Sequence, residues 1–192
     1  MRERLAILTL SLMVGTLCAS NAADKMDRLI VYGKDFAFGV KEPSGWTGDT
    51  QSSGAFSANI VFYRTKKALK GDAPIIKVRL NHKVDEDTGK DLQADTDGYK
   101  KQYSGVQFQE LEVTHPEYHC FAKAFVVEKR LHEYVAYVNP GEGRPELLSV
   151  SLSTDKNAAS IDELAAFRSV ISSLVILGKK PNNGMQPPAG GR

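Results

Sequence analysis

The sequence predicts an α+β domain, a mainly antiparallel β-sheet flanked by helices. Three observations lead to this fold class. Several short runs alternate between apolar and polar side chains, as strands do when one face of a sheet is covered and the other is wet. Two segments, residues 88–103 and 160–174, instead repeat apolar residues at helical spacing. The resulting order of several strands, a helix, four strands and a terminal helix is typical of a sheet with helices packed on it.

The first half of the chain contains three strand-like stretches. Each is bounded by glycine, proline or polar residues, which interrupt strands. In the third, Lys77, Arg79 and Asn81 share a polar face, while the residues between them are apolar or, in His82, aromatic. The stretches are residues 29–40, which form a strand or a short hairpin around Gly33-Lys34-Asp35, residues 56–63 and residues 75–82.

A helix is expected to follow. Thr88 can cap its start, and Asp91, three residues later, favours the positive end of the helix. Leu92, Tyr99 and Tyr103 can share one face at helical spacing. The segment from Thr88 to Tyr103 is therefore predicted to be helical.

Four further strands are expected in close succession. In the last of them Ser149, Ser151 and Ser153 alternate with apolar residues, so the serines read as its wet face. The sequence Asn-Pro-Gly-Glu-Gly at 139–143 is a strong turn signal. The four runs are residues 106–113, 118–128, 132–138 and 147–152.

The clearest helix comes last. Ser160 and Glu163 form a capping box, the pattern in which each residue bonds the backbone of the other. Gly178 and Pro181 are expected to end the segment. The apolar stripe, which must bury against the sheet, consists of Leu164, Phe167, Ile171 and Leu174.

The N-terminus reads as a secretory signal peptide over residues 1–22. Arg2 and Arg4 precede an apolar run from Leu5 to Leu17, and small residues follow it. The run is too short to span a membrane, which takes about 20 apolar residues, and no later stretch comes close. Cys18 follows Leu17, which does not fit a lipoprotein signal. We therefore expect no transmembrane span and a periplasmic or secreted protein, with one domain at 23–178 and a disordered tail at 179–192.

Two elements carry a resemblance to a known family. One is the stretch from Phe36 to Pro43-Ser44-Gly45-Trp46, and the other is the terminal helix that closes with Ser172-Ser173-Leu174. Over about residues 28–176 this resembles the PsbP-like fold family, which includes small exported, DcrB-like bacterial proteins. The resemblance implies an α/β/α sandwich and protein binding rather than catalysis. It supplies no site residues.

The residues indicate no catalytic constellation and no cofactor. There is no Gly-x-Ser-x-Gly elbow, phosphate loop or dinucleotide fingerprint. Lys66, Lys67 and Lys70 cluster, but the formal net charge is only +2 and the strong basic footprint of a nucleic-acid domain is missing. The acidic stretch over residues 85–97 does not match the spacing of a calcium loop. We therefore expect neither an enzyme nor a nucleic-acid partner.

A metal site is conceivable at His115, His119 and Cys120. The two histidines are four residues apart, and the cysteine is adjacent. The alternative is ordinary half-buried histidines and a buried cysteine that behaves as a small hydrophobe. Pro116 and the missing fourth ligand favour this alternative.

The aromatic residues suggest where a partner protein could bind. Trp46 follows a Pro-Ser-Gly turn beside the polar loop 47–54, so it either fills the edge of the core or lines a groove. Tyr63 could add to such a surface. The sequence thus favours an exported, non-enzymatic adaptor or accessory factor that binds another envelope protein through Trp46 and Tyr63. The alternative is a small-molecule or metal-binding periplasmic domain.

Overall fold

The computed structural model describes residues 27–32, 36–71, 74–83, 88–128, 130–154 and 157–179. The expected leader, the turn at 33–35 and the tail beyond residue 179 lie outside these ranges. Within them, no helix is long and apolar enough to cross a membrane. The structure has two antiparallel sheets and two α-helices, which confirms the predicted α+β class.

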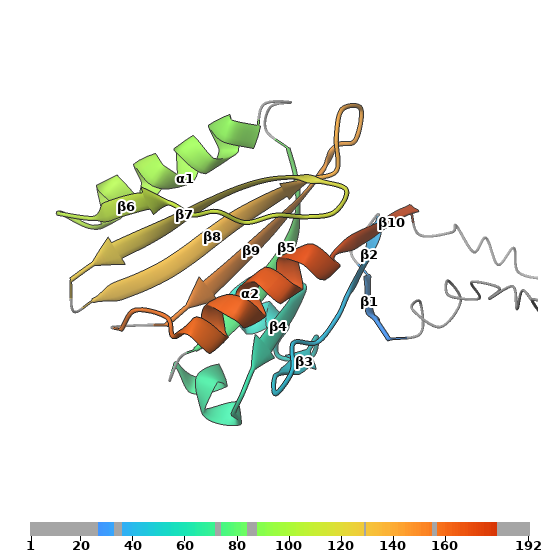
Figure 1. The fold of residues 1–192 in the computed structure, drawn as a ribbon, viewed down its shortest axis with the longest axis horizontal. Coiled ribbons are helices and arrows are strands. Elements are labelled where there is room, and N and C mark those ends of the chain that lie inside the picture. The colour runs from blue at the N-terminus through green and yellow to red at the C-terminus, as the bar shows by residue number, and fades with distance from the viewer. Residues whose placement is uncertain are drawn as a thin grey trace, which may run out of the picture.

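A seven-stranded antiparallel sheet forms the body of the molecule (Figure 1). Its strand order is β3-β4-β5-β9-β8-β7-β6, so β9 pairs with β5 on one side and β8 on the other. Long central strands and short edge strands give the sheet its shape. The strands are β3 (Thr47–Asp49), β4 (Ile60–Tyr63), β5 (Ile75–His82), β6 (Gln107–Glu110), β7 (His119–Val127), β8 (Leu131–Asn139) and β9 (Glu146–Ser153).

A three-stranded sheet lies beside it, in the order β1-β2-β10. Strands β1 (Leu29–Tyr32) and β2 (Phe36–Val40) pair antiparallel, as the hairpin prediction required. Strand β10 (Val175–Lys179) is a correction to the sequence analysis, which placed the end of the terminal helix at Gly178 and Pro181. The helix ends at Ser173 because β-branched Val175 and Ile176 extend the chain, and Ile176 buries itself beside Phe38.

One face of the large sheet carries the main core, under α2 (Ile161–Ser173) and the small sheet. Figure 1 shows α2 lying across the large sheet. The capping box is present: Glu163 N–H donates to Ser160 Oγ over 3.3 Å, and Ser160 N–H donates to Glu163 Oε2 over 2.8 Å. Phe167 and Ile171 of the predicted stripe are fully buried. This layer encloses most of the large apolar side chains.

The other face of the sheet is covered only at its two ends. At one end α1 (Thr88–Gln102) buries Leu92 against Phe125, Val135 and Leu147. At the other end two 3-10 turns, η1 (Ser53–Phe56) and η2 (Lys66–Lys70), cover the outer surface of β4 and β5. The polar side chains that the sequence assigned to the wet face lie between these two apolar clusters.

Two predicted strands are shorter in the structure than in the sequence analysis. The alternation over 56–63 becomes a strand only from Ile60, because 53–56 forms η1 and Ser57 adopts a left-handed backbone. The run at 106–113 pairs only over Gln107–Glu110. The other predicted strands begin and end within two residues of their predicted boundaries. Strand β3 is a correction, because it lies in residues 47–54, which the sequence analysis read as a polar loop, and it pairs with β4.

Candidate functional site: a polar cavity on the second face of the sheet

A cavity of about 210 Å³ lies between the two apolar clusters on the second face. Its floor is the outer surface of β5, β9 and β8, and its walls are α1 and the end of η1 with the two residues after it. α1 contributes Asp95 and Tyr99, which share its inner face with Leu92 at helical spacing. The second wall is made by Phe56, Ser57 and Ala58.

The cavity exists because the middle strand of its floor carries small residues. Ser149 and Ser151 of β9 stand between the longer side chains of the neighbouring strands. Across the sheet Ser149 lies opposite Arg79 and Tyr137, and Ser151 lies opposite Lys77. Since side chains on neighbouring strands stand side by side, short serines leave a trough between the β5 cations and the β8 side chains.

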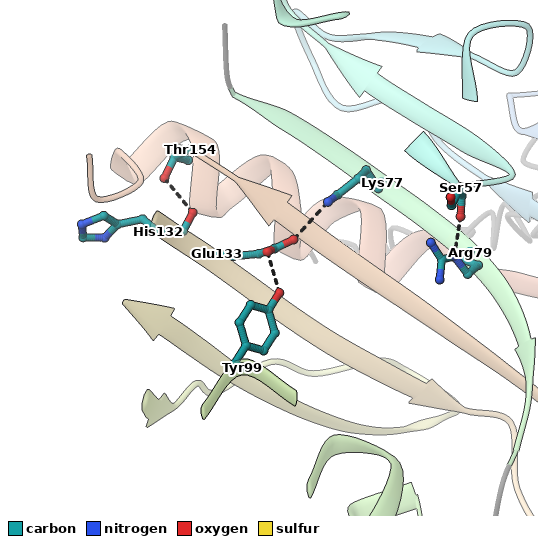
Figure 2. Close-up of polar contacts among 7 residues, drawn as sticks. All are labelled: Ser57, Lys77, Arg79, Tyr99, His132, Glu133 and Thr154. Atoms are coloured by element: carbon teal, nitrogen blue, oxygen red, sulfur yellow. Dashed lines mark hydrogen bonds and ion pairs between the residues drawn. The ribbon is translucent and has the colours of Figure 1, made fainter. Parts of the chain in front are cut away.

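Glu133 of β8 is the centre of one polar network (Figure 2). Lys77 Nζ lies 3.0 Å from Glu133 Oε1, and Tyr99 O–H donates to Glu133 Oε2 over 2.5 Å. The Tyr99 ring stacks on Phe125 with 4.2 Å between ring centroids, which fixes the hydroxyl in place. Burial, and then the charge of Glu133, raise the pKa of Tyr99 far above its ordinary value, so the phenol remains a donor.

Asp95 and Tyr137 form a second network beside the first. Tyr137 O–H donates to Asp95 Oδ2 over 2.6 Å. Burial is the main reason that the pKa of Asp95 is raised, and the nearby charge of Glu133 adds to it. The Tyr137 hydroxyl and the charge of Arg79 act in the opposite direction on the same carboxyl. The pKa of Tyr137 is raised as well, first by burial and then by Asp95.

Arg79 and Asn81 complete the β5 side. Arg79 donates through Nε to the backbone carbonyl of Ser57, which Figure 2 shows beside it. Asn81 donates through Nδ2 to Ser149 Oγ over 2.9 Å. These contacts hold the side chains of two strands and one loop in fixed positions around a solvent-accessible space. The arrangement can bind a small polar molecule by hydrogen bonds and charge.

The sequence analysis did not single out these residues, although two of its observations pointed toward them. It assigned Lys77, Arg79 and Asn81 to a wet face, and it did the same for the serines of β9. It could not predict the pairing of β5 with β9 or the position of α1, because both depend on contacts between residues far apart in the sequence. One further signal was available, since Glu133 is a charged residue directly before the apolar and aromatic residues 134–138 of the same predicted strand.

The three candidate metal ligands do not come together. Among the described residues no group of three or more histidine, cysteine or acidic side chains could hold a metal ion. His115 Nδ1 accepts from the backbone N–H groups of Glu117 and Tyr118, and its Nε2 lies 2.8 Å from the carbonyl oxygen of Leu174. His119 and Cys120 are consecutive residues of β7, so their side chains point to opposite faces.

The two aromatic residues proposed for partner binding are internal. Trp46 is 5% exposed and belongs to the main core, with the Arg64 guanidinium 5.3 Å from its ring centroid. It also lines a separate cavity of about 450 Å³ together with Arg28 and Glu42. Tyr63 is 6% exposed, packs in the cluster under η2, and lies 3.4 Å from Asp49 Oδ2 through its hydroxyl. They form no shared exposed surface, and their role in binding stays a prediction.

Exposed apolar side chains gather instead on the small sheet. Ile30 and Tyr32 of β1 lie opposite Gly39 and Ala37 of β2, and Tyr32 is 61% exposed. Leu177 of β10 is also exposed. Val31 and Ile176, their neighbours in sequence, point into the core. The three exposed residues, Ile30, Tyr32 and Leu177, are called the small-sheet face below.

The fold and the site define a class, an α+β protein with two antiparallel sheets and a charged cavity on the less covered sheet face. No protein-family model matches the chain, so the PsbP-like resemblance is not confirmed. A search of curated proteins also finds no match.

One similar solved structure is LpqN, described as involved in cell envelope biogenesis of Mycobacterium tuberculosis. It is 19% identical, the match covers 78% of this chain and 90% of that chain, and the TM-score is 0.47.

Proposed function

We propose that the protein is an exported, non-enzymatic binding protein of the cell envelope, and that the cavity beside α1 is its site for a small polar molecule. The observation that carries the proposal is the cavity itself. It sits at the centre of a sheet face and is lined by charged side chains that hydrogen bonds hold in place. Such preorganised concave sites are the usual place for small ligands.

The hydrogen bonds within the cavity favour binding over catalysis. A carboxylate that acts as a general base needs a free oxygen lone pair within reach of a substrate proton. Both oxygens of Glu133 are occupied, by Lys77 and Tyr99, whereas Asp95 accepts from Tyr137 through Oδ2 alone. Among the described residues that line the cavity there is no histidine or cysteine to serve as a base or nucleophile. We therefore assign Glu133 a role in positioning a ligand rather than in catalysis.

A cavity-filling substitution tests the proposal. The chain is titrated with a panel of small polar molecules, and binding is followed by amide chemical shifts and thermal stability. At a ligand concentration of about one hundred times Kd, binding raises the free energy of unfolding by about 2.7 kcal/mol. We expect at least one saturable ligand that shifts the amides of Ala58 and Ser151. Ser151→Phe should abolish this binding, whereas Ser172→Phe, an exposed position on α2, should not. Binding that survives Ser151→Phe would show that the cavity is not the site.

The small-sheet face favours a second candidate function, binding of another envelope protein. Exposed apolar clusters of this kind mark protein contacts. Cross-linking in cells is compared for the natural chain, Tyr32→Ser and Ile161→Ser. Ile161 is 87% exposed but stands apart at the start of α2, so it controls for apolar exposure alone. A single cross-linked partner lost in Tyr32→Ser and kept in Ile161→Ser is the expected result. An identical cross-linking pattern in all three would remove this candidate.

A further inference from the structure

The cations of the cavity have hydrogen-bonding capacity that the protein does not use. A guanidinium carries five N–H donors, and the described contacts of Arg79 use the one on Nε. No ion pair links Arg79 to a carboxylate within the described residues. Lys77 has three N–H donors, and Glu133 takes one. The terminal nitrogens of Arg79 are therefore the main unfilled donors of the cavity.

The carboxylate oxygens of the cavity are more fully used: three of the four accept a hydrogen bond, and Asp95 Oδ1 accepts none among the described contacts. The two tyrosine hydroxyls point at the two carboxylates, Tyr99 at Glu133 and Tyr137 at Asp95. Lys77 fills the remaining oxygen of Glu133. Ser149 Oγ receives Asn81. A ligand rich in hydrogen-bond donors would meet mainly Asp95 Oδ1, whereas a ligand rich in acceptors would meet the guanidinium and the serine hydroxyls.

The positions of the charges agree with this asymmetry. Lys77 and Arg79 come from one strand and stand along the same side of the serine trough. The charge of Glu133 is offset by Lys77 at 3.0 Å, whereas Arg79 forms no direct ion pair among the described residues, although Asp95 lies near enough to interact with its charge. The raised pKa of Asp95 also makes this carboxyl easier to protonate, which reduces its repulsion of an anion.

The size of the cavity limits the ligand. At roughly 30 Å³ for each water molecule, 210 Å³ corresponds to about seven waters. This volume suits a small anion of a few carbon atoms or an inorganic anion.

From these observations we infer that the cavity takes a small oxyanion, a carboxylate or a phosphate, held by the terminal nitrogens of Arg79 above Ser149 and Ser151. The planar guanidinium matches both groups with two parallel hydrogen bonds. This inference rests on the proposed function, because it names the chemical class of the ligand for the same cavity.

The experiment titrates the chain with four probes by calorimetry at low ionic strength. Succinate and inorganic phosphate are the two oxyanions and separate the two sources of that group. Succinamide is the uncharged counterpart of succinate, and glucose is an uncharged polyol. Each titration is repeated with Arg79→Ala, Arg79→Lys and Arg168→Ala. Arg168 is exposed on α2, on the other side of the sheet, so its loss changes the net charge equally without touching the cavity.

We expect one of the two oxyanions to bind, and neither uncharged probe to compete with it. Arg79→Ala should weaken binding at least about tenfold, since a charge-assisted bond is lost. Arg79→Lys should restore part of the affinity, and Arg168→Ala should leave it unchanged. All variants alter exposed side chains, and thermal unfolding checks that each is folded.

Two results would overturn the inference but leave the proposed function intact. One is saturable binding of succinamide or glucose without binding of either anion. The other is an equal loss in Arg79→Ala and Arg168→Ala, which would reflect net charge alone. Absence of binding by every probe, together with an unresponsive cavity in the broader panel, would count against the inference and the proposed function together.

Discussion

Replacing Tyr99 by phenylalanine removes one hydroxyl from the cavity and changes little else. The ring remains stacked on Phe125 at 4.2 Å, so the packing of α1 on the sheet is preserved. What is lost is the 2.5 Å hydrogen bond to Glu133 Oε2. Glu133 keeps Lys77 as a partner, so its charge is not left alone.

The expected loss of stability follows from the surroundings of this bond. Hydrogen bonds to charged groups contribute about 1.5–3 kcal/mol. The Glu133 side chain is 13% exposed and borders a polar cavity, so water can replace part of the lost contact. We therefore expect the lower end, about 1.5 kcal/mol, which corresponds to about 3–6 °C in Tm for a chain of this size.

The assay is urea unfolding of four proteins, the natural chain, Tyr99→Phe, Glu133→Gln and the double variant. The Tyr99→Phe loss should shrink by about 1 kcal/mol in the Glu133→Gln background, because a neutral acceptor binds the hydroxyl less strongly. Tyr103→Phe is the matched control. Among the described residues the Tyr103 hydroxyl contacts only Gln102, over 3.3 Å, and this contact is exposed to solvent. If Tyr99→Phe and Tyr103→Phe lose the same stability within about 0.5 kcal/mol, the reasoning on this network is refuted.

Three further predictions concern the helix cap at Ser160, the carboxyl group of Asp95 and the thiol of Cys120. Ser160→Ala should lower the free energy of unfolding by about 1 kcal/mol in urea because the capping box is lost, whereas exposed Ser172→Ala on the same helix should stay within about 0.5 kcal/mol. The folded pKa of Asp95 is raised, so its contribution to stability is complete below the unfolded value of 3.8 and is lost as pH rises through the folded pKa. Asp95→Asn, which keeps an acceptor for Tyr137, should therefore gain stability relative to the natural chain as the pH rises above the unfolded value of 3.8, and urea midpoints of the two proteins that do not diverge above this pH would contradict it. Burial raises the pKa of Cys120 to about 11, so alkylation by iodoacetamide at about pH 8 should be much slower in the native chain than in urea, and equal rates would show an accessible thiol.

Local sequence patterns predicted the elements that depend on contacts between residues close together in the chain. The Ser160–Glu163 box and the apolar stripe behind it located the start of α2, because a cap is a contact between residues three apart. Period-two alternation located β5 and β9, since each strand has one face in the core and one outside it. Strand β10 was missed for the opposite reason. Its first three residues, Val175 to Leu177, continue the apolar character of the helix, and the pairing with β2 that favours a strand is a long-range contact.

The site was harder to predict because its residues are brought together by the sheet. Arg79 meets Ser149 through a strand pairing that spans about half of the domain, and Asp95 reaches Tyr137 across the helix–sheet interface. The sequence identified the polar faces of the strands but could not tell an open wet face from a cavity. The placement of α1 decides this, and it depends on Leu92 and Tyr99 packing on Phe125.

The two faces of the large sheet differ in the side chains that fill them. The face under α2 is filled by large apolar side chains, among them the fully buried Phe38, Phe62 and Phe167. Such a core can supply most of the folding free energy on its own. The second face is therefore free to keep charged residues and serines at its centre, where a continuous apolar layer would otherwise be expected. A protein without ligand-binding needs would gain stability by filling this trough, since hydrophobic replacement of half-buried ion pairs is often neutral or stabilising. Ser151→Val tests this, because the valine fits a strand and covers the stem of Lys77. If the variant is more stable and binds no oxyanion, the polar floor is retained for binding at the expense of stability. If it is less stable, the serines are part of the fold.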